Sequence, residues 1–105
     1  MRTEPNAKKN ITPAIICKAP WRLIYVKPLE NYRLEVEFVD GTHGFVDMQQ
    51  RIMSKKAGIF VQIRDMAVFN QVHLEHGVAT WPGEIDLAPD AMHEEIKRNH
   101  IWILK

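Results

Sequence analysis

The amino-acid sequence predicts a small α+β domain. The domain would consist of a small antiparallel sheet, formed by β-hairpins, and of two short helices. Its 105 residues suit one domain with a modest core. Residues 32–39 alternate apolar and polar side chains, the pattern of a half-buried strand. The other apolar segments are short and lack the regular intervening helices of a parallel sheet, which argues against a doubly wound fold.

Two parts of the chain differ in composition. Residues 1–20 are polar, are interrupted by three prolines and show no apolar periodicity in their first ten positions. We expect them to form a flexible leader. Residues 21–105 are expected to form the single domain.

The clearest local prediction is a hairpin. Its apolar face is expected to consist of Tyr32, Leu34, Val36 and Phe38. The next dipeptide, Asp40-Gly41, favours a tight turn, because these residues accept positive φ. Residues 42–47 then form the return strand. A preceding strand is predicted over 21–27, ended by Pro28.

Two short helices are expected. The first spans residues 48–56, with Asp47 as its N-cap. The second begins around Asp86, a candidate cap, has Pro89 near its first turn and continues to Arg98, where a cation complements the helix dipole.

The remaining segments are less regular. Residues 59–69 fit either a helical or an irregular segment. Residues 72–75 and 78–81 predict two strands joined across His76-Gly77. The apolar tail, residues 101–105, fits either a final strand of the sheet or a dimer contact.

Charge is uneven along the chain, although the formal net charge is only +1. Residues 1–58 contain ten Lys/Arg and six Asp/Glu, whereas residues 59–105 contain four and seven. The balance is far from that of strongly basic domains that hold nucleic acid by charge. The split instead favours head-to-tail or hetero-association with protein.

The compartment follows from what the chain lacks. Cys17 is the single cysteine, so neither an internal disulfide nor a thiolate metal cage can form. No segment approaches the roughly 18–20 apolar residues that span a bilayer. The short run at residues 11–17 contains a proline and makes a poor signal-peptide core. We expect a cytoplasmic protein with no membrane contact.

Three segments occur in an order and spacing that resemble a known family. They are Phe38-Val39-Asp40-Gly41 with Gly44, Val46 and Asp47 downstream; Ile63-Arg64-Asp65 followed by Phe69; and Trp81-Pro82 with Gly83, Ile85, Asp86 and Leu87. The family is the bacterial proteins grouped as domain of unknown function 2442, and the resemblance covers residues 21–97. The chain departs from the family in lacking an asparagine before Gly83.

The resemblance implies a small α+β fold and a bacterial source. It implies no established catalytic residue, because the family itself is uncharacterised. Some members resemble the partner half of paired toxin–antitoxin-type genes.

Six residues are candidates for binding. Tryptophan is enriched at binding hot spots, so the candidates include Trp81, with its neighbour Pro82, and Trp102. Trp81 also fits a core anchor at a strand end. Three aspartates could line one pocket with Trp81, although each also suits a turn or a helix cap. These aspartates are Asp47, Asp65 and Asp86.

The residues favour no metal and no cofactor. His73 and His76, with Glu75 between them, have the only metal-like spacing. In a strand that runs into a turn, residues three apart point to opposite faces, and two ligands fall short of the three that catalytic zinc takes. Ser54 and Cys17 lack the neighbours that a nucleophile requires.

We therefore predict a non-catalytic domain that works by protein–protein contact, with a protein partner or a second copy of itself. The role would be regulatory, as the antitoxin-like half of a two-gene system. One alternative is a small-ligand binder or enzyme that uses the Asp/Trp pocket. Another is a nucleic-acid-binding regulator, whose basic patch would comprise Lys8, Lys9, Lys18, Arg51, Lys55 and Lys56.

Overall fold

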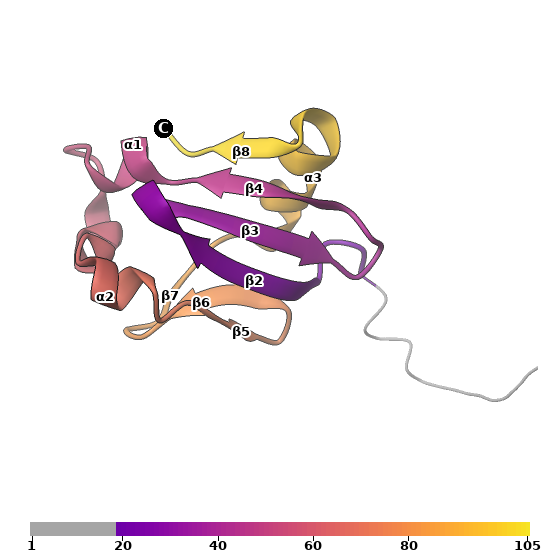
Figure 1. The fold of residues 1–105 in the computed structure, drawn as a ribbon, viewed down its shortest axis with the longest axis horizontal. Coiled ribbons are helices and arrows are strands. Elements are labelled where there is room, and N and C mark those ends of the chain that lie inside the picture. The colour runs from indigo at the N-terminus through magenta and orange to yellow at the C-terminus, as the bar shows by residue number, and fades with distance from the viewer. Residues whose placement is uncertain (1–18) are drawn as a thin grey trace, which may run out of the picture.

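Short strands form two sheets that share one core. The computed structural model describes residues 19–105, which contain a four-stranded sheet in the order β2-β3-β4-β8 and a three-stranded sheet in the order β5-β6-β7 (Figure 1). Residues 19–105 also contain three α-helices and two 3-10 helices. The α+β class predicted from the sequence is confirmed.

The bounds of the elements are as follows. The first sheet consists of β2 (Leu23–Leu29), β3 (Arg33–Phe38), β4 (His43–Asp47) and β8 (Ile101–Ile103). The second consists of β5 (His73–Glu75), β6 (Val78–Trp81) and β7 (Ile85–Asp86). The α-helices are α1 (Gln49–Ile52), α2 (Met66–Phe69) and α3 (Pro89–Asn99), and the 3-10 helices are η2 (Glu30–Tyr32) and η3 (Gly58–Ile63).

The hairpin of β3 and β4 is built as the alternation predicts from residue 33 onward, whereas Tyr32, predicted on the same strand face, ends η2 with a φ of 59°. Leu34, Val36 and Phe38 are fully buried, and the charged side chains between them lie on the other face. At the turn, Gly41 has a φ of 90°, and Oδ1 of Asp40 accepts a hydrogen bond from the amide of Thr42. The second predicted hairpin is confirmed as β5 and β6.

Pro28 does not end the first strand. The strand predicted over 21–27 is displaced, and β2 continues to Leu29. Proline cannot donate to a ladder, but β2 is the outermost strand of its sheet, where the missing N–H is tolerated.

The prediction of a helix over 48–56 is wrong in its C-terminal half, because α1 ends at Ile52. The guanidinium of Arg64 donates hydrogen bonds to the carbonyl oxygens of Ile52 and Ser54, at 2.8 and 3.2 Å. Distant side-chain donors therefore satisfy the carbonyls that a longer helix would have used. The N-cap is Met48 rather than Asp47, although Oδ1 of Asp47 accepts from the amide of Gln49 at 3.1 Å.

The last helix also begins later than predicted. Asp86 is not its cap: it lies in β7, opposite Thr80, and Ala88 occupies the N-cap position. Burial of Ile85 beside Trp81 keeps this part of the chain extended. Pro89, whose fixed φ suits a first helical residue, then starts α3.

The apolar tail forms a strand of the sheet, which was one of its two alternatives. The sheet is antiparallel, as predicted, except at this edge, where β8 pairs with β4 in parallel. His100, whose backbone has the left-handed conformation with a φ of 67°, ends α3 and directs the chain back along the sheet. The sequence separation between β4 and β8 hides this pairing from local patterns.

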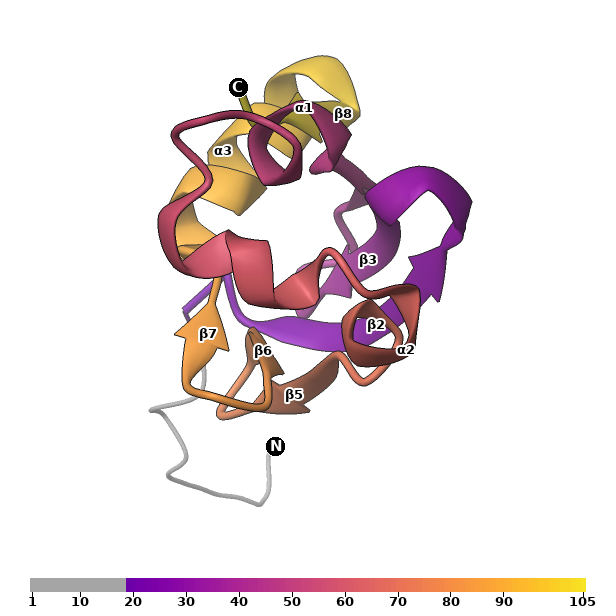
Figure 2. The ribbon, with the colours of Figure 1, turned by 90° about the vertical axis from the view of Figure 1, so that its left-hand side faces the viewer.

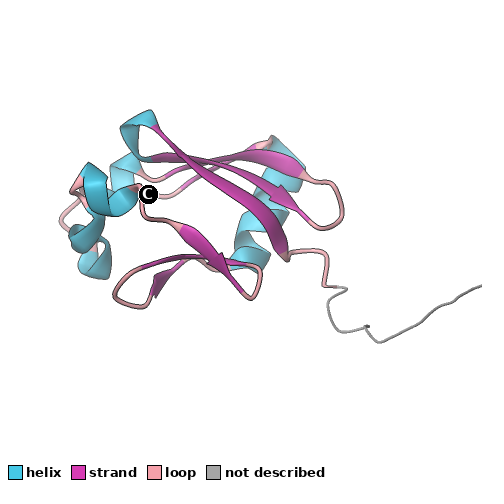
Figure 3. Cartoon of the chain, turned by 60° about the horizontal axis from the view of Figure 1, so that its bottom comes forward, coloured by secondary structure: helices cyan, strands magenta, loops and turns pink. Residues whose placement is uncertain are grey.

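The core lies between the two sheets and α3. Figure 3 shows α3 and the three-stranded sheet on one side of the four-stranded sheet, and Figure 2 shows the segment from α1 to α2 crossing one end of the molecule. Residues 59–69, which fitted a helical or an irregular segment, form η3 and α2 there. The largest fully buried side chains are Trp81, Phe38, Phe69, Leu34, Met48, Ile52, Ile63, Ile85, Met92, Ile96, Val36 and Val46.

Asp40 ties the hairpin turn to α3. Its Oδ2 lies 2.9 Å from Nε2 of His93 and 3.5 Å from Nζ of Lys97. The hydrogen bond from the Thr42 amide, followed by the contact with His93, holds the pKa of this carboxyl well below its ordinary value. The ionised form is therefore stabilised in the folded state.

We expect the stabilisation from Asp40 to be lost in acid. A carboxyl whose folded pKa is depressed contributes above its unfolded pKa of about 3.9, and the contribution disappears as the pH falls below that value. Asp40→Asn should lower the free energy of unfolding by about 1–2 kcal/mol at pH 7 and progressively less from pH 4 downward. Urea unfolding at a series of pH values measures this, with Asp90→Asn, on α3, as the control. A difference that is the same at pH 7 and pH 2.5 would contradict the assignment.

Candidate functional site

Within residues 19–105, no strand pairs with the outer edge of β8. The amide of Phe45 donates to the carbonyl of His100, and the amide of Leu104 donates to the carbonyl of Asp47. In a parallel ladder this alternation turns the backbone groups of Ile101 and Ile103 away from β4. Figure 1 shows β8 as the outermost strand, so these groups face outward. The edge can accept another strand.

The side chains next to this edge are apolar. On the outer face of the sheet Ile101 lies beside Phe45, and Ile103 lies beside Asp47. Ile103 is 47% exposed and Phe45 is 38% exposed, although both are large apolar residues. The edge of β8, with Phe45, Ile101 and Ile103, is called the β8 surface below. Exposed apolar side chains beside an open edge are typical of a binding surface.

The opposite edge of the same sheet is protected. β2 contains Pro28, which has no N–H to offer, and its register shifts between Leu23 and Tyr25. Its first residues are also occupied, because the amide of Leu23 donates to the carbonyl of Gly77. Prolines and irregularities of this kind prevent edge-to-edge pairing, and β8 has neither of them.

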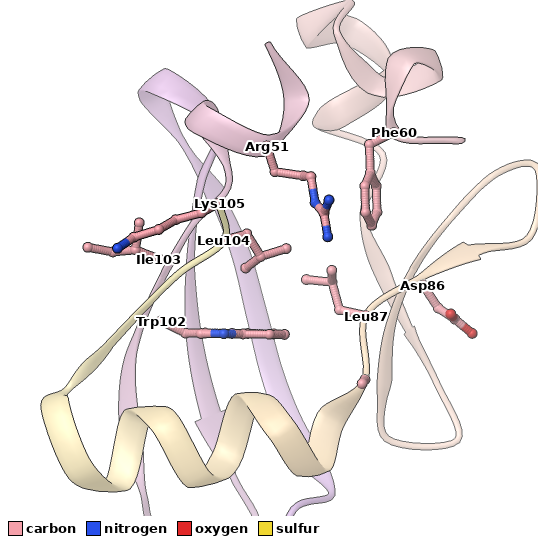
Figure 4. Close-up of a pocket in the computed structure, with 9 residues that line it drawn as sticks. Arg51, Phe60, Asp86, Leu87, Trp102, Ile103, Leu104 and Lys105 are labelled. Carbon is pink, nitrogen blue, oxygen red and sulfur yellow. The ribbon is translucent and has the colours of Figure 1, made fainter. Parts of the chain in front are cut away.

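A pocket of about 320 Å³ lies behind β8. Figure 4 shows Trp102 at its base, Leu104 and Leu87 at its centre, and Phe60 on its far side. The guanidinium of Arg51 points between Phe60 and the two leucines. The pocket thus combines apolar walls with the guanidinium of Arg51, and Asp86 and Lys105 lie at its margin.

The six predicted binding residues do not form one cluster. Asp86 and Trp102 both line the pocket behind β8, but the carboxylate of Asp86 points away from its centre (Figure 4). Trp81 lies in the core, and the neighbouring Pro82 is exposed. The other two aspartates act locally: Asp65 caps α2 through the amide of Ala67, and Asp47 accepts from Gln49 and lies 3.6 Å from Nε of Arg33.

The sequence pattern did not single out Phe45 or the orientation of Arg51, whereas Ile103 belongs to the tail for which a dimer contact was one of two predictions. A signal existed for Phe45, because Phe45 and Val46 are adjacent apolar residues in an otherwise alternating strand, and one of them must face outward. No local signal could have separated Arg51 from the lysines near it. Its direction depends on η3 and β8, which come from distant parts of the sequence.

The histidine pair does not come together as a ligand set. Nε2 of His73 contacts Oε2 of Glu75 at 2.8 Å, and this hydrogen bond raises the pKa of His73. His76 occupies the following turn with a φ of 55°. Within residues 19–105 no three His, Cys, Asp or Glu side chains gather as a metal site would require.

The predicted basic patch is only partly visible. Lys55 and Lys56 are exposed on the loop after α1, whereas Arg51 turns into the pocket. Lys8, Lys9, Lys18 and Cys17 lie outside the described residues, as does the predicted leader apart from Ala19 and Pro20. None of the helices described is long and apolar enough to cross a membrane.

Comparison with known proteins gives one match. The family model described as protein of unknown function (DUF2442) matches residues 23–98, which include all three segments that suggested the resemblance. No curated protein and no solved structure matches the chain.

Proposed function

We propose that this chain, which belongs to the DUF2442 family of proteins of unknown function, is a non-catalytic protein-interaction domain that binds through the β8 surface. The observation that supports this most directly is the open edge of β8, flanked by exposed apolar side chains. The occupant that fits it best is a second copy of the same chain. In keeping with the family resemblance, the proposed role is regulatory, as the antitoxin-like half of a two-gene system in the bacterial cytoplasm.

The edge is self-complementary in an antiparallel arrangement. With a twofold axis at Trp102, Ile101 of one copy lies opposite Ile103 of the other. The backbone N–H and C=O groups of both residues point outward, so each such pair can exchange two hydrogen bonds. The two four-stranded sheets would become one continuous sheet.

Apolar contact and charge also suit this pairing. On the outer face, the row that contains Asp47 and Ile103 continues into Ile101 and Phe45 of the second copy. The two copies of Asp47 therefore do not meet, and each remains beside its own Arg33. Removing Phe45 and Ile103 from water adds a hydrophobic term to the backbone hydrogen bonds.

The test is the concentration dependence of mass in light scattering, with the full chain. We expect the wild type to rise from the monomer mass of 12.2 kDa towards twice that value as its concentration increases. Ile103→Lys places a charge on the edge and should weaken association at least tenfold. Deletion of residues 101–105 is less suitable, because it also removes Leu104 from the core.

A matched control is available on the opposite edge of the sheet. Ile24 on β2 is 55% exposed, so Ile24→Lys makes the same change at a similarly exposed side chain on the protected edge. It should leave association unchanged. A wild type that stays monomeric at millimolar concentration, or equal effects of the two variants, would overturn self-association through β8. A monomer that binds a different protein through β8 would overturn it as well.

A further inference from the structure

We infer that the pocket behind β8 is a binding site for a small organic carboxylate with an apolar body, recognised by Arg51. This site shares Ile103 with the β8 surface, whereas Arg51, Phe60 and Leu87 of its lining lie behind the strand. The inference depends on three features: an arginine with an unsatisfied buried donor, apolar walls around it, and a volume suited to a small molecule.

The main evidence for this site is the side chain of Arg51. Its Nε is buried and has no hydrogen-bond partner among residues 19–105. The one hydrogen bond that its side chain makes to these residues joins Nη1 to the carbonyl of Lys56, at a long 3.4 Å. No carboxylate of those residues lies within ion-pair distance of it. A partly buried guanidinium without an anionic partner is costly, and an anion held by its outer nitrogens in the pocket would offset that cost through its charge.

Other arginines of the described residues show the contrast. Arg33 lies beside Asp47, and Arg98 pairs with Glu94 and Glu95. Arg64 donates to two backbone carbonyls through Nε and Nη2. Arg51 differs because it points into open space between hydrophobic side chains (Figure 4).

The walls define the rest of the ligand. Phe60 and Trp102 lie on two sides of the pocket, and Leu87 and Leu104 lie between them (Figure 4). Aromatic and aliphatic walls bind an apolar body, while a guanidinium holds a carboxylate through two parallel hydrogen bonds. A volume of about 320 Å³ is at the lower end for ligand sites, so the body is of the order of one aromatic ring.

A carboxylate fits better than a phosphate. A phosphate monoester carries close to two negative charges and needs several donors. The second cation of the lining, Lys105, points away from the centre of the pocket (Figure 4). One arginine matches one carboxylate in charge and in geometry.

The experiment titrates benzoate into the full chain and follows the indole N–H signals of the three tryptophans by NMR. We expect the Trp102 signal to shift and saturate, whereas that of Trp81 in the core stays in place and reports that the protein is folded. Benzamide has the same shape without the charge and should bind at least tenfold more weakly. Inorganic phosphate should produce no saturable shift.

Variants separate the site from general charge effects. Arg51→Gln should abolish saturation, and Arg51→Lys, which retains the charge but not the paired donors, should weaken it at least tenfold. Lys55→Gln is the matched control, because it removes an exposed cation from the neighbouring loop, and benzoate should bind it as it binds the wild type. The inference is overturned if benzoate and benzamide bind equally, if phosphate alone saturates, or if a folded Arg51 variant binds benzoate unchanged. The titration keeps the protein concentration fixed, so that the benzoate-dependent shift of Trp102 is read apart from self-association.

Discussion

Replacing Trp81 with alanine is expected to lower the free energy of unfolding by about 3–5 kcal/mol, the range found for large buried aromatic side chains. The side chain is 1% exposed. Its ring lies 5.8 Å from that of Phe69, centroid to centroid, and its Nε1 donates a hydrogen bond of 2.8 Å to the Phe69 carbonyl. The change therefore leaves a cavity and also removes the shorter of two hydrogen bonds to the Phe69 carbonyl, which the Val72 amide reaches at 3.3 Å.

The expected loss is a large share of the stability of a domain of this size, which is typically about 5–15 kcal/mol. Urea unfolding followed by circular dichroism measures it. Trp21→Ala is the matched control, because Trp21 is 43% exposed and its removal should change stability by about 0.5 kcal/mol or less. Trp81→Phe separates the two contributions, since it retains most of the ring but loses the donor. Similar stability in the Trp81→Ala and Trp21→Ala variants would contradict the central place of Trp81 in the core.

Trp81 illustrates what sequence could and could not predict about the site. A tryptophan at the end of a strand fits both a binding hot spot and a core anchor, because both need a large apolar surface. Which of the two roles applies depends on whether the indole N–H can donate to the carbonyl of Phe69, twelve residues earlier. No local sequence pattern predicts that contact. The hydrogen bond shows a core contact for this side chain.

The local periodicities were good predictors where one face of an element is buried. The alternation in residues 32–39 placed Leu34, Val36 and Phe38 correctly, and the short strands on either side of His76-Gly77 were also located. The proline near the start of α3 and the cations in its last turn marked that helix. In each case neighbouring residues determine the structure, so a short window contains the information.

The features that position the candidate sites depend on distant residues. α1 ends early because Arg64 occupies its last carbonyls, and Asp86 is a strand residue because Ile85 is buried beside Trp81. The pocket draws its lining from α1, η3, β7 with the two residues after it, and β8 with the end of the chain, which no sequence window spans. The parallel pairing of β8 with β4 likewise joins segments that lie far apart in the sequence.

Gly44 shows how closely β8 is fitted against β4, and we expect Gly44→Ala to displace that strand. A Cβ at this position would lie 2.5 Å from the carbonyl oxygen of His100 and 2.5 Å from Cγ2 of Ile96. The Ile96 methyl belongs to a side chain, but the His100 oxygen belongs to the backbone and accepts the hydrogen bond of the Phe45 amide at 3.2 Å. Relief of the overlap therefore requires the junction of α3 and β8 to move away from the sheet.

The expected cost is about 1–3 kcal/mol in the free energy of unfolding, as for other overpacked positions. A local effect should accompany it: the amides of Phe45 and Leu104, which join β4 to β8, should exchange with solvent faster, while those within the β2–β3 pair should not. Hydrogen exchange measured by NMR resolves the two groups. His43→Ala, at an exposed position of the same strand, controls for a change in strand propensity. Equal acceleration of all sheet amides would mean that the alanine weakens the whole domain, whereas selective acceleration at β8 would identify Gly44 as the residue that lets α3 and β8 close against the sheet.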